Sequence, residues 1–294
     1  MSQLKRIFMK SFLAVASLFL VPVLLSCTGP KVEFLTDIGV CTRVSNSELL
    51  ANSGYSYIEE GVRNFLVPLE SEEKFNELLE LASKSKLPVL ACNGFLPGDL
   101  KSVGEEAVHP EILEFAETAF RRAKMAGVKI IVFGSGASRA IPEDFPREKA
   151  REQFVHLCSQ MGPLAAKYDV TVVIEPLNKK ECNFINSVAE GGEIVKDVNH
   201  PNIQLLADIY HMKMDDENPE NILKYGKFLR HTHIAEKEGR AAPGTHGEDF
   251  RPYFEALKKV KYKGKISIEG RWEDMETQAP TAIKVIQEQV KNKN

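Results

Sequence analysis

Four short apolar runs in the second half of the chain end in acidic or imidazole side chains: VTVVIEPLN (170–178), IQLLADIYHM (203–212), LRHTHIAE (229–236) and KISIEG (265–270). The polar side chains at these ends are Glu175 in the first run, Asp208 and His211 in the second, His231, His233 and Glu236 in the third, and Glu269 in the last. Burying a carboxylate is unfavourable unless it is paired or bound to a cation. The occurrence of such groups at the same end of four successive strands therefore predicts a shared metal site.

The same alternation extends through the chain and decides the fold class. We expect strands over 33–43, 55–61, 87–94, 129–136, 170–176, 203–211, 228–236 and 265–270. Helical patterns lie between or after them, over 71–85, 110–127, 147–169, 187–198, 218–226, 249–260 and 277–291. Short apolar strands that alternate with helices are typical of a parallel sheet. Eight such units predict a single α/β domain, a (β/α)8 TIM barrel.

A doubly wound open sheet is the alternative fold. It would require a glycine-rich nucleotide loop after an early strand, and the segment Gly134-Ser135-Gly136 is too weak a match. The barrel also explains the chemistry, because active sites of TIM barrels lie where the strands end. Neighbouring strands are close enough for inward-pointing groups at one level to reach one ion.

Three carboxylates and one imidazole, from Glu175, Asp208, Glu269 and His233, make a site rich in hard oxygen ligands without a thiolate. Such a site favours Mn²⁺, with Mg²⁺ and Co²⁺ as alternatives, over structural zinc. Each residue taken alone has another interpretation. A carboxylate at a strand end can cap the next helix or pair with an arginine, and His231 can be a hydrogen-bonded core histidine.

Composition sets the limits of these interpretations. The chain has 294 residues, of which 43% are hydrophobic and 27% charged, with a formal net charge of -3. These values fit one large soluble domain and give no electrostatic support for binding nucleic acid. The cysteines Cys41, Cys92, Cys158 and Cys182 form no CxxC pair, and we interpret them as small buried hydrophobes.

The N-terminus has the features of an export signal. Lys5, Arg6 and Lys10 precede the apolar run SFLAVASLFLVPVLL (11–25), which is shorter than the ~20 residues of a spanning helix. The run ends in LLSC (24–27), which resembles a bacterial lipobox. We therefore expect a lipoprotein signal peptide over 1–26, lipidation of Cys27, and a barrel domain over 27–294 anchored in the cell envelope, facing the periplasm or on the surface. An uncleaved membrane anchor with an incidental cysteine is the alternative.

Four segments carry a family resemblance: IEPLNKKECNF (174–184), LLADIYHM (205–212), HTHIAEKEGRAAPG (231–244) and SIEG (267–270). They resemble the sugar isomerase/epimerase superfamily of xylose isomerase-like TIM barrels. Within it, the ketose 3-epimerases of the tagatose/psicose type are the most similar branch. The strong motifs lie within 173–270, although the likeness extends over the whole barrel domain.

The resemblance implies a role for individual residues. The family's metal ligands match Glu175, Asp208, His233 and Glu269, and its acid–base pair matches Glu175 and Glu269. Its substrate-binding residues match Glu181, His211 and Arg240. Arg240 lies one residue further from His233 than its counterpart does in these epimerases, which leaves its role and the shape of the substrate open.

The activity implied is that of a divalent-metal-dependent isomerase or epimerase. It would take a proton from a free or glycosidic keto-sugar and return it through an enediolate held on the metal, and the site alone does not separate epimerisation from aldose–ketose isomerisation. A lyase or hydrolase of a 3-keto-glycoside or inosose-type substrate is the alternative, as is an enzyme acting on hydroxypyruvate. A silent sugar-binding lipoprotein and an apurinic endonuclease-like hydrolase fit less well.

The expected partners follow from the same features. They are a small keto-sugar and a membrane reached through the N-terminal lipid anchor, with no nucleic acid, because the chain is slightly acidic and exported. Assembly into a homo-oligomer stays open.

Overall fold

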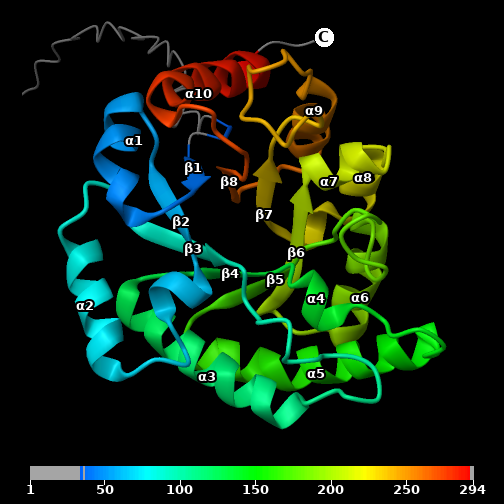
Figure 1. The fold of residues 1–294 in the computed structure, drawn as a ribbon. Helices are drawn as coiled ribbons and strands as arrows, with labels where there is room; N and C mark the ends of the chain where they lie inside the picture. Colours follow the sequence, from blue (N-terminus) through cyan, green and yellow to red (C-terminus); the bar gives the residue numbers. More distant parts are fainter. Residues whose placement is uncertain (1–33, 36, 292–294) are drawn as a thin grey trace, which may run out of the picture. The chain divides into compact units, whose positions relative to one another are not determined.

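Eight parallel strands close into a barrel in the order of the sequence, with helices around the outside, in the computed structural model of the chain (Figure 1). The structure describes residues 34–35 and 37–291. Each strand pairs in parallel with the next, and the last strand pairs with the first to close the ring. The predicted (β/α)8 TIM barrel is confirmed, whereas the expected signal segment and the lipidated Cys27 lie outside the described residues.

The strands fall within the ranges predicted for them. They are β1 (Ile38–Cys41), β2 (Tyr57–Gly61), β3 (Val89–Asn93), β4 (Ile130–Phe133), β5 (Thr171–Ile174), β6 (Ile203–Asp208), β7 (Leu229–Ile234) and β8 (Lys265–Ile268).

The long predicted helices are present, and several short ones join them. The helices are α1 (Ser47–Ser53), α2 (Glu72–Ser83), α3 (His109–Ala126), α4 (Gly136–Arg139), α5 (Arg147–Lys167), α6 (Val188–Val198), α7 (Ile209–Met214), α8 (Glu220–Tyr225), α9 (Arg251–Lys259) and α10 (Met275–Lys291). Single turns of other helix types are η1 (Val44–Asn46), η2 (Val62–Leu66) and η3 (Gly226–Phe228).

One predicted boundary near the site is wrong. The expected strand over 203–211 ends at Asp208, and His211 lies on α7 instead of at the strand end. Asp208 causes the change of structure, because its Oδ1 accepts a hydrogen bond from the backbone N–H of Tyr210 at 2.8 Å. An aspartate in this position caps the start of a helix.

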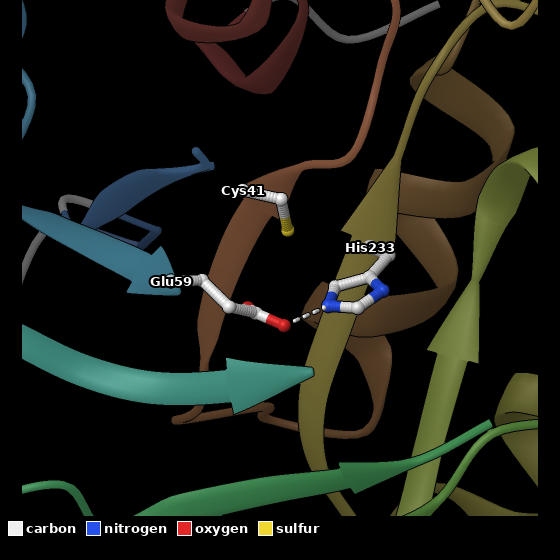
Figure 2. Close-up of side chains that lie close together, drawn as sticks. All are labelled: Cys41, Glu59 and His233. Atoms are coloured by element: carbon white, nitrogen blue, oxygen red, sulfur yellow. Dashed lines mark hydrogen bonds and ion pairs between the residues drawn. The ribbon is translucent and has the colours of Figure 1, made fainter. Parts of the chain in front are cut away.

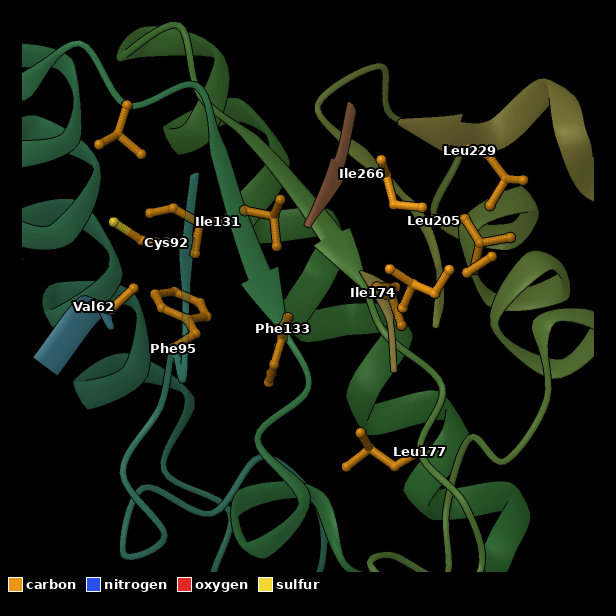
Figure 3. Close-up of a cluster of buried hydrophobic side chains, with 14 of the residues drawn as sticks. Val62, Cys92, Phe95, Ile131, Phe133, Ile174, Leu177, Leu205, Leu229 and Ile266 are labelled. Atoms are coloured by element: carbon orange, nitrogen blue, oxygen red, sulfur yellow. The ribbon is translucent and has the colours of Figure 1, made fainter. Parts of the chain in front are cut away.

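Alternate residues of the strands build two separate apolar layers. Ile131, Phe133 and Ile174 point outward and pack under the helices, where Figure 3 shows them among the buried side chains. Val132 and Val173 point into the barrel, where they form a small cluster with Leu206. Strands that are apolar on both faces explain why the sequence shows continuous apolar runs rather than strict alternation.

The other side of the barrel interior is polar. Tyr57 and Glu59 from β2, His231 from β7 and Ser267 from β8 are all buried there. Polar groups buried in this way need hydrogen-bond partners, and they find them in one another, as described below. Among the described residues, no helix combines the length and apolar character needed to cross a membrane.

Candidate metal centre

The four residues predicted as metal ligands meet at the carboxyl ends of β5 to β8. Glu175 and Glu269 each follow the last residue of their strand, and Asp208 and His233 are directly paired in the register of β6 and β7. One donor atom of each of the four lies within 4.8 Å of the others. The sequence pattern therefore predicted a juxtaposition that the fold produces, while the roles of the residues stay predictions.

His233 lies at the centre of this group. Its Nδ1 is 2.8 Å from Oε1 of Glu175 and 3.2 Å from Oε2 of Glu269. Asp208 contributes a buried oxygen, Oδ2, that has no hydrogen-bond partner among the described residues. A buried carboxylate oxygen without a hydrogen bond, beside two further carboxylates and an imidazole, is the arrangement that a divalent cation would satisfy. The residues therefore fit a metal ion.

The carboxylates of this group differ in their affinity for protons. Burial raises the pKa of Glu175, and the nearby charge of Glu269 raises it further. Burial also raises the pKa of Asp208. Partial burial would raise the pKa of Glu269, whose side chain is 25% exposed, but the charges of His233 and Arg240 outweigh that effect and lower its pKa to about 2. Two carboxylates whose pKa values are driven apart are suited to complementary acid and base roles.

The three residues predicted to bind substrate lie beside the four ligands. Nη2 of Arg240 forms an ion pair with Glu269 Oε2 and lies 3.6 Å from Asp208 Oδ2. Its Nη1 lies 3.7 Å from Oε1 of Glu181, which in turn is 4.0 Å from Nδ1 of His211. The extra residue before Arg240 does not keep its guanidinium from the site, where it stacks over Tyr210 at 4.6 Å from the ring centre.

Asn178 orients two of these residues, and the sequence reasoning missed it. Its side-chain amide lies 2.9 Å from Oε1 of Glu181 and 2.8 Å from Nδ1 of His211, and its backbone N–H donates to the same Nδ1 at 3.3 Å. With Nδ1 accepting, the proton of neutral His211 is on Nε2, a buried atom with no hydrogen-bond partner among the described residues. His211 therefore places a donor beside the metal ligands, 3.4 Å from Asp208 Oδ2.

Asn93, at the end of β3, was also missed. Its Nδ2 donates to Oε1 of Glu269 at 2.9 Å. The carboxylate of Glu269 is therefore held by Asn93 at Oε1 and by Arg240 at Oε2. The strand-end rule that identified the four ligands would have found Asn93 if amides had been considered along with charged groups.

Two residues that follow β4, Gly134 and Arg139, hold Glu175 in position. Gly134 leaves room for its carboxylate, because a Cβ at this position would overlap with Glu175 Oε2. Arg139 is fully buried. Its guanidinium donates to the carbonyl oxygens of Phe133 at 3.0 Å and Glu175 at 2.6 Å, and thereby ties the ends of β4 and β5 together.

A second group of polar side chains lies behind His233. Cys41, Glu59 and His233 point toward one another from β1, β2 and β7 (Figure 2), with one donor atom of each within 4.8 Å of the others. Oε1 of Glu59 is 2.9 Å from Nε2 of His233, and Oε2 is 2.7 Å from Nε2 of His231. Despite complete burial, the two imidazoles hold the pKa of Glu59 well below its usual value.

Glu236, at the end of the third run, shapes the loop that carries Arg240. It is fully buried, and its carboxylate accepts backbone N–H bonds from Gly244 at 2.7 Å, His246 at 2.6 Å and Gly247 at 3.2 Å. A buried carboxylate with several N–H donors needs no metal to be satisfied. Glu236 is therefore a structural residue rather than a further ligand.

Comparison with known proteins identifies related chains. A family model described as a xylose isomerase-like TIM barrel matches residues 47–289. A probable ketose 3-epimerase of Synechocystis is 31% identical over 259 residues, which cover 85% of this chain and 88% of that protein. The 3-dehydro-D-guloside 4-epimerase of Escherichia coli is 26% identical over 201 residues, which cover 66% of this chain and 76% of that one.

Solved structures have the same fold. A D-psicose 3-epimerase from Clostridium cellulolyticum, solved with D-tagatose, superposes with a TM-score of 0.74 at 20% identity and covers 87% of this chain and 100% of that chain. At this level of identity the superposition shows a common architecture, and the function must be argued from the site.

Proposed function

We propose, from the premise that this chain belongs to the xylose isomerase-like TIM-barrel family, that it is a metal-dependent epimerase of a free or glycosidic keto-sugar. One observation carries the proposal: Glu175 and Glu269 are candidate metal ligands and also a carboxylate pair with opposite pKa shifts. The relatives named above, which are sugar epimerases, support the same reaction class.

Glu175, Asp208, His233 and Glu269 would hold the ion, and Mn²⁺ suits their oxygen-rich set better than a thiophilic metal. When bound, a divalent metal would stabilise the negative charge that develops on the oxygens of a keto-sugar after a proton is lost. The protein residues would supply the remaining functions, which are proton transfer and positioning of the substrate.

Proton transfer needs one group that is ionised and one that carries a proton. Glu175 and Glu269 would divide these roles: one carboxylate would take the proton from the carbon next to the carbonyl, and the other would return one from the opposite face. The roles would reverse in the reverse reaction.

Positioning of the substrate would fall to the residues beside the ligands. Nε2–H of His211 and the carboxylate of Glu181, whose side chain is 40% exposed, offer a donor and an acceptor for sugar hydroxyls. Arg240 would contact a substrate oxygen while it neutralises the carboxylates around it. These contacts would fix which carbon lies between the two glutamates.

A lyase or hydrolase of 3-keto-glycosides is the second candidate. It begins with the same removal of a proton next to a ketone, and a 3-keto-glycoside is what the name of the Escherichia coli relative describes as its substrate class. The two outcomes diverge only when the resulting anion either accepts a proton or expels the glycosidic oxygen.

Turnover of a panel of free ketoses and 3-keto-glycosides, with added Mn²⁺ in D₂O, would test the proposal. We expect an epimer with deuterium on the inverted carbon, detected by NMR. Release of the aglycone would favour the lyase or hydrolase, and no turnover of any keto-sugar with bound metal would contradict both.

We further propose that the barrel is exported and anchored by a lipid on Cys27 to the bacterial cell envelope. The lipobox-like LLSC and the basic apolar segment before it support this location. An extracytoplasmic location favours unphosphorylated sugars as substrates, because sugar phosphates are rare outside the cytoplasm.

A further inference from the structure

We propose that Glu59 is a positioning residue that directs Nδ1 of His233 toward the metal, an inference that rests on the proposed function. Glu59 is not one of the four candidate ligands, yet it is fully buried behind one of them. Figure 2 shows its carboxylate directed at the imidazole of His233, where it contacts Nε2. Glu175 and Glu269 lie at the other ring nitrogen, Nδ1.

Which nitrogen of His233 faces the metal follows from the hydrogen-bonding capacity of Glu59 and of the imidazole. An ionised carboxylate only accepts hydrogen bonds, so the contact of 2.9 Å requires a proton on Nε2 of His233. In a neutral imidazole the other nitrogen, Nδ1, then carries the free electron pair. Nδ1 is the atom that faces Glu175 at 2.8 Å and Glu269 at 3.2 Å, and an ion bound among these carboxylates would take the place of the proton that Nδ1 shares with Glu175. Glu59 therefore selects the tautomer that can bind an ion among these carboxylates.

Glu59 is itself held in place by further donors. Its Oε2 accepts from Oγ of Ser267 at 2.6 Å and from Nε2 of His231 at 2.7 Å. The hydroxyl of Tyr57 lies 2.8 Å from the same Oγ, which leaves the serine proton free for Glu59. With three donors on two oxygens, the carboxylate cannot rotate without leaving a buried donor unsatisfied. Side chains from β2, β7 and β8 thus fix the orientation of Glu59, and Glu59 in turn fixes the orientation of the His233 ring.

The same side chains allow a competing interpretation. Cys41, Glu59 and His233 are close enough to hold an ion of their own on the side of Nε2. Such an ion would displace the proton from Nε2 and would break the hydrogen bond from His233 to Glu59. The short contacts of Glu59 with Ser267 and His231 are those of an acceptor surrounded by donors, which favours the hydrogen-bonded arrangement.

Metal affinity of two Glu59 variants would test the proposal. Glu59→Gln keeps an acceptor of similar shape but removes the charge, and Glu59→Leu removes both acceptors. Loss of a hydrogen-bond partner of a ligating histidine weakens metal binding by about 10- to 100-fold. We expect a loss near the lower figure for Gln and near the higher one for Leu, measured for Mn²⁺ by competition with a fluorescent chelator.

Glu60→Gln is the matched control. Glu60 is the next residue of β2 and is also buried, but its carboxylate accepts from the backbone N–H groups of Val44 and Gly61, away from the ligands. We expect its Mn²⁺ affinity to equal that of the unaltered protein. Equal affinity in Glu59→Leu, Glu60→Gln and the unaltered protein would overturn the proposal.

A measurement on the unaltered protein keeps the test independent of folding in the variants. With Zn²⁺ as a diamagnetic probe, ¹⁵N NMR of the histidine rings should show Nε2 of His233 protonated and Nδ1 bound to the metal. Binding through Nε2, or an ion lost with Cys41→Ser, would overturn the role of Glu59 while leaving a metal centre in place. If the unaltered protein bound no ion at all, the proposed function would fail, and this inference with it.

Discussion

Gly134 and Glu175 directly follow the neighbouring strands β4 and β5, and the carboxylate of Glu175 fills the space that a Cβ on the glycine would need. A Cβ built on Gly134 would overlap with Oε2 of Glu175, and its next neighbour is the carboxylate carbon at 3.3 Å. The backbone at Gly134 is not in the left-handed region, so the absence of a side chain is needed for space alone. The glycine therefore belongs to the structure of the candidate site.

Gly134→Ala should displace the carboxylate of Glu175 with little effect on the barrel. A misplacement of about 1 Å in a catalytic group can lower turnover by ~10²-fold. We expect a loss of that order, with a thermal unfolding midpoint close to that of the unaltered protein. Retention of full activity would show that Glu175 can work from another position, and a large fall in the midpoint would show that the glycine serves folding instead.

The metal centre should depend on the charge of Asp208. Its Oδ2 is buried without a hydrogen bond among the described residues, and Asp208→Asn would remove one formal charge from the site while it keeps the size of the side chain. We expect about one divalent ion per chain in the unaltered protein and a strongly weakened affinity in the variant. Undiminished metal content in an Asp208→Ala, Glu269→Ala double variant would place any bound ion elsewhere.

Cys27 should determine where the protein is found. If it carries a lipid, the protein should fractionate with membranes and lack residues 1–26. Cys27→Ala should convert it to a soluble or unprocessed form, detected by fractionation and by the mass of the chain. Unaltered protein that is found in the cytoplasm with its first residues still attached would contradict the lipoprotein assignment.

Stability at low pH should depend on Glu72, far from the site. Hydrogen bonds from Arg121 and Arg122 lower the pKa of Glu72 to about 2. Because this pKa is depressed from an unfolded value of about 4.3, the contribution to stability is present above that pH and is lost as the pH falls toward 2. The half-exposed carboxylate limits the effect to about 1 kcal/mol or less.

Glu72→Gln provides the measurement for this ion pair. In urea unfolding, the variant should be less stable than the unaltered protein at pH 7, and the two should converge as the pH approaches 2. A difference that stays constant between pH 7 and pH 3 would mean that packing rather than charge is responsible.

The sequence predicted the four candidate ligands because a charged group at the end of an apolar run is unusual wherever it occurs. It could not predict the group behind them. Glu59 and Glu60 are adjacent, and which of them faces the barrel interior depends on the register of β2, where the pairing with β3 shifts between Ile58 and Glu59. Arg139 was missed for a similar reason, because a buried arginine that binds carbonyl oxygens has the same sequence signature as an exposed one.

The position of His211 shows how local capping changes a predicted element. A continuous apolar pattern over 203–211 predicted a strand, but the side chain of Asp208 caps a helix there and turns His211 away from the strand direction. Because the turn is short, His211 still lies 3.4 Å from Asp208 Oδ2, and the candidate site keeps the residue that the motif supplied.

The two glutamates of the candidate acid–base pair should both be needed for turnover. Glu175→Gln and Glu269→Gln keep the size of the side chain and one oxygen, so the fold and part of the metal affinity should survive. An amide cannot accept the proton, so the loss should fall on the chemical step, by ~10² or more.

His211→Asn and Glu181→Gln are the matched comparisons, because they act on substrate contacts rather than on proton transfer. They should raise the KM more than they lower kcat, and should leave measurable turnover. The unaltered enzyme should also introduce deuterium from solvent at the carbon next to the carbonyl. Full activity in either Glu175→Gln or Glu269→Gln would refute the two-base mechanism. Turnover without deuterium would be weaker counter-evidence, because a shielded proton can return to the substrate before it exchanges with water.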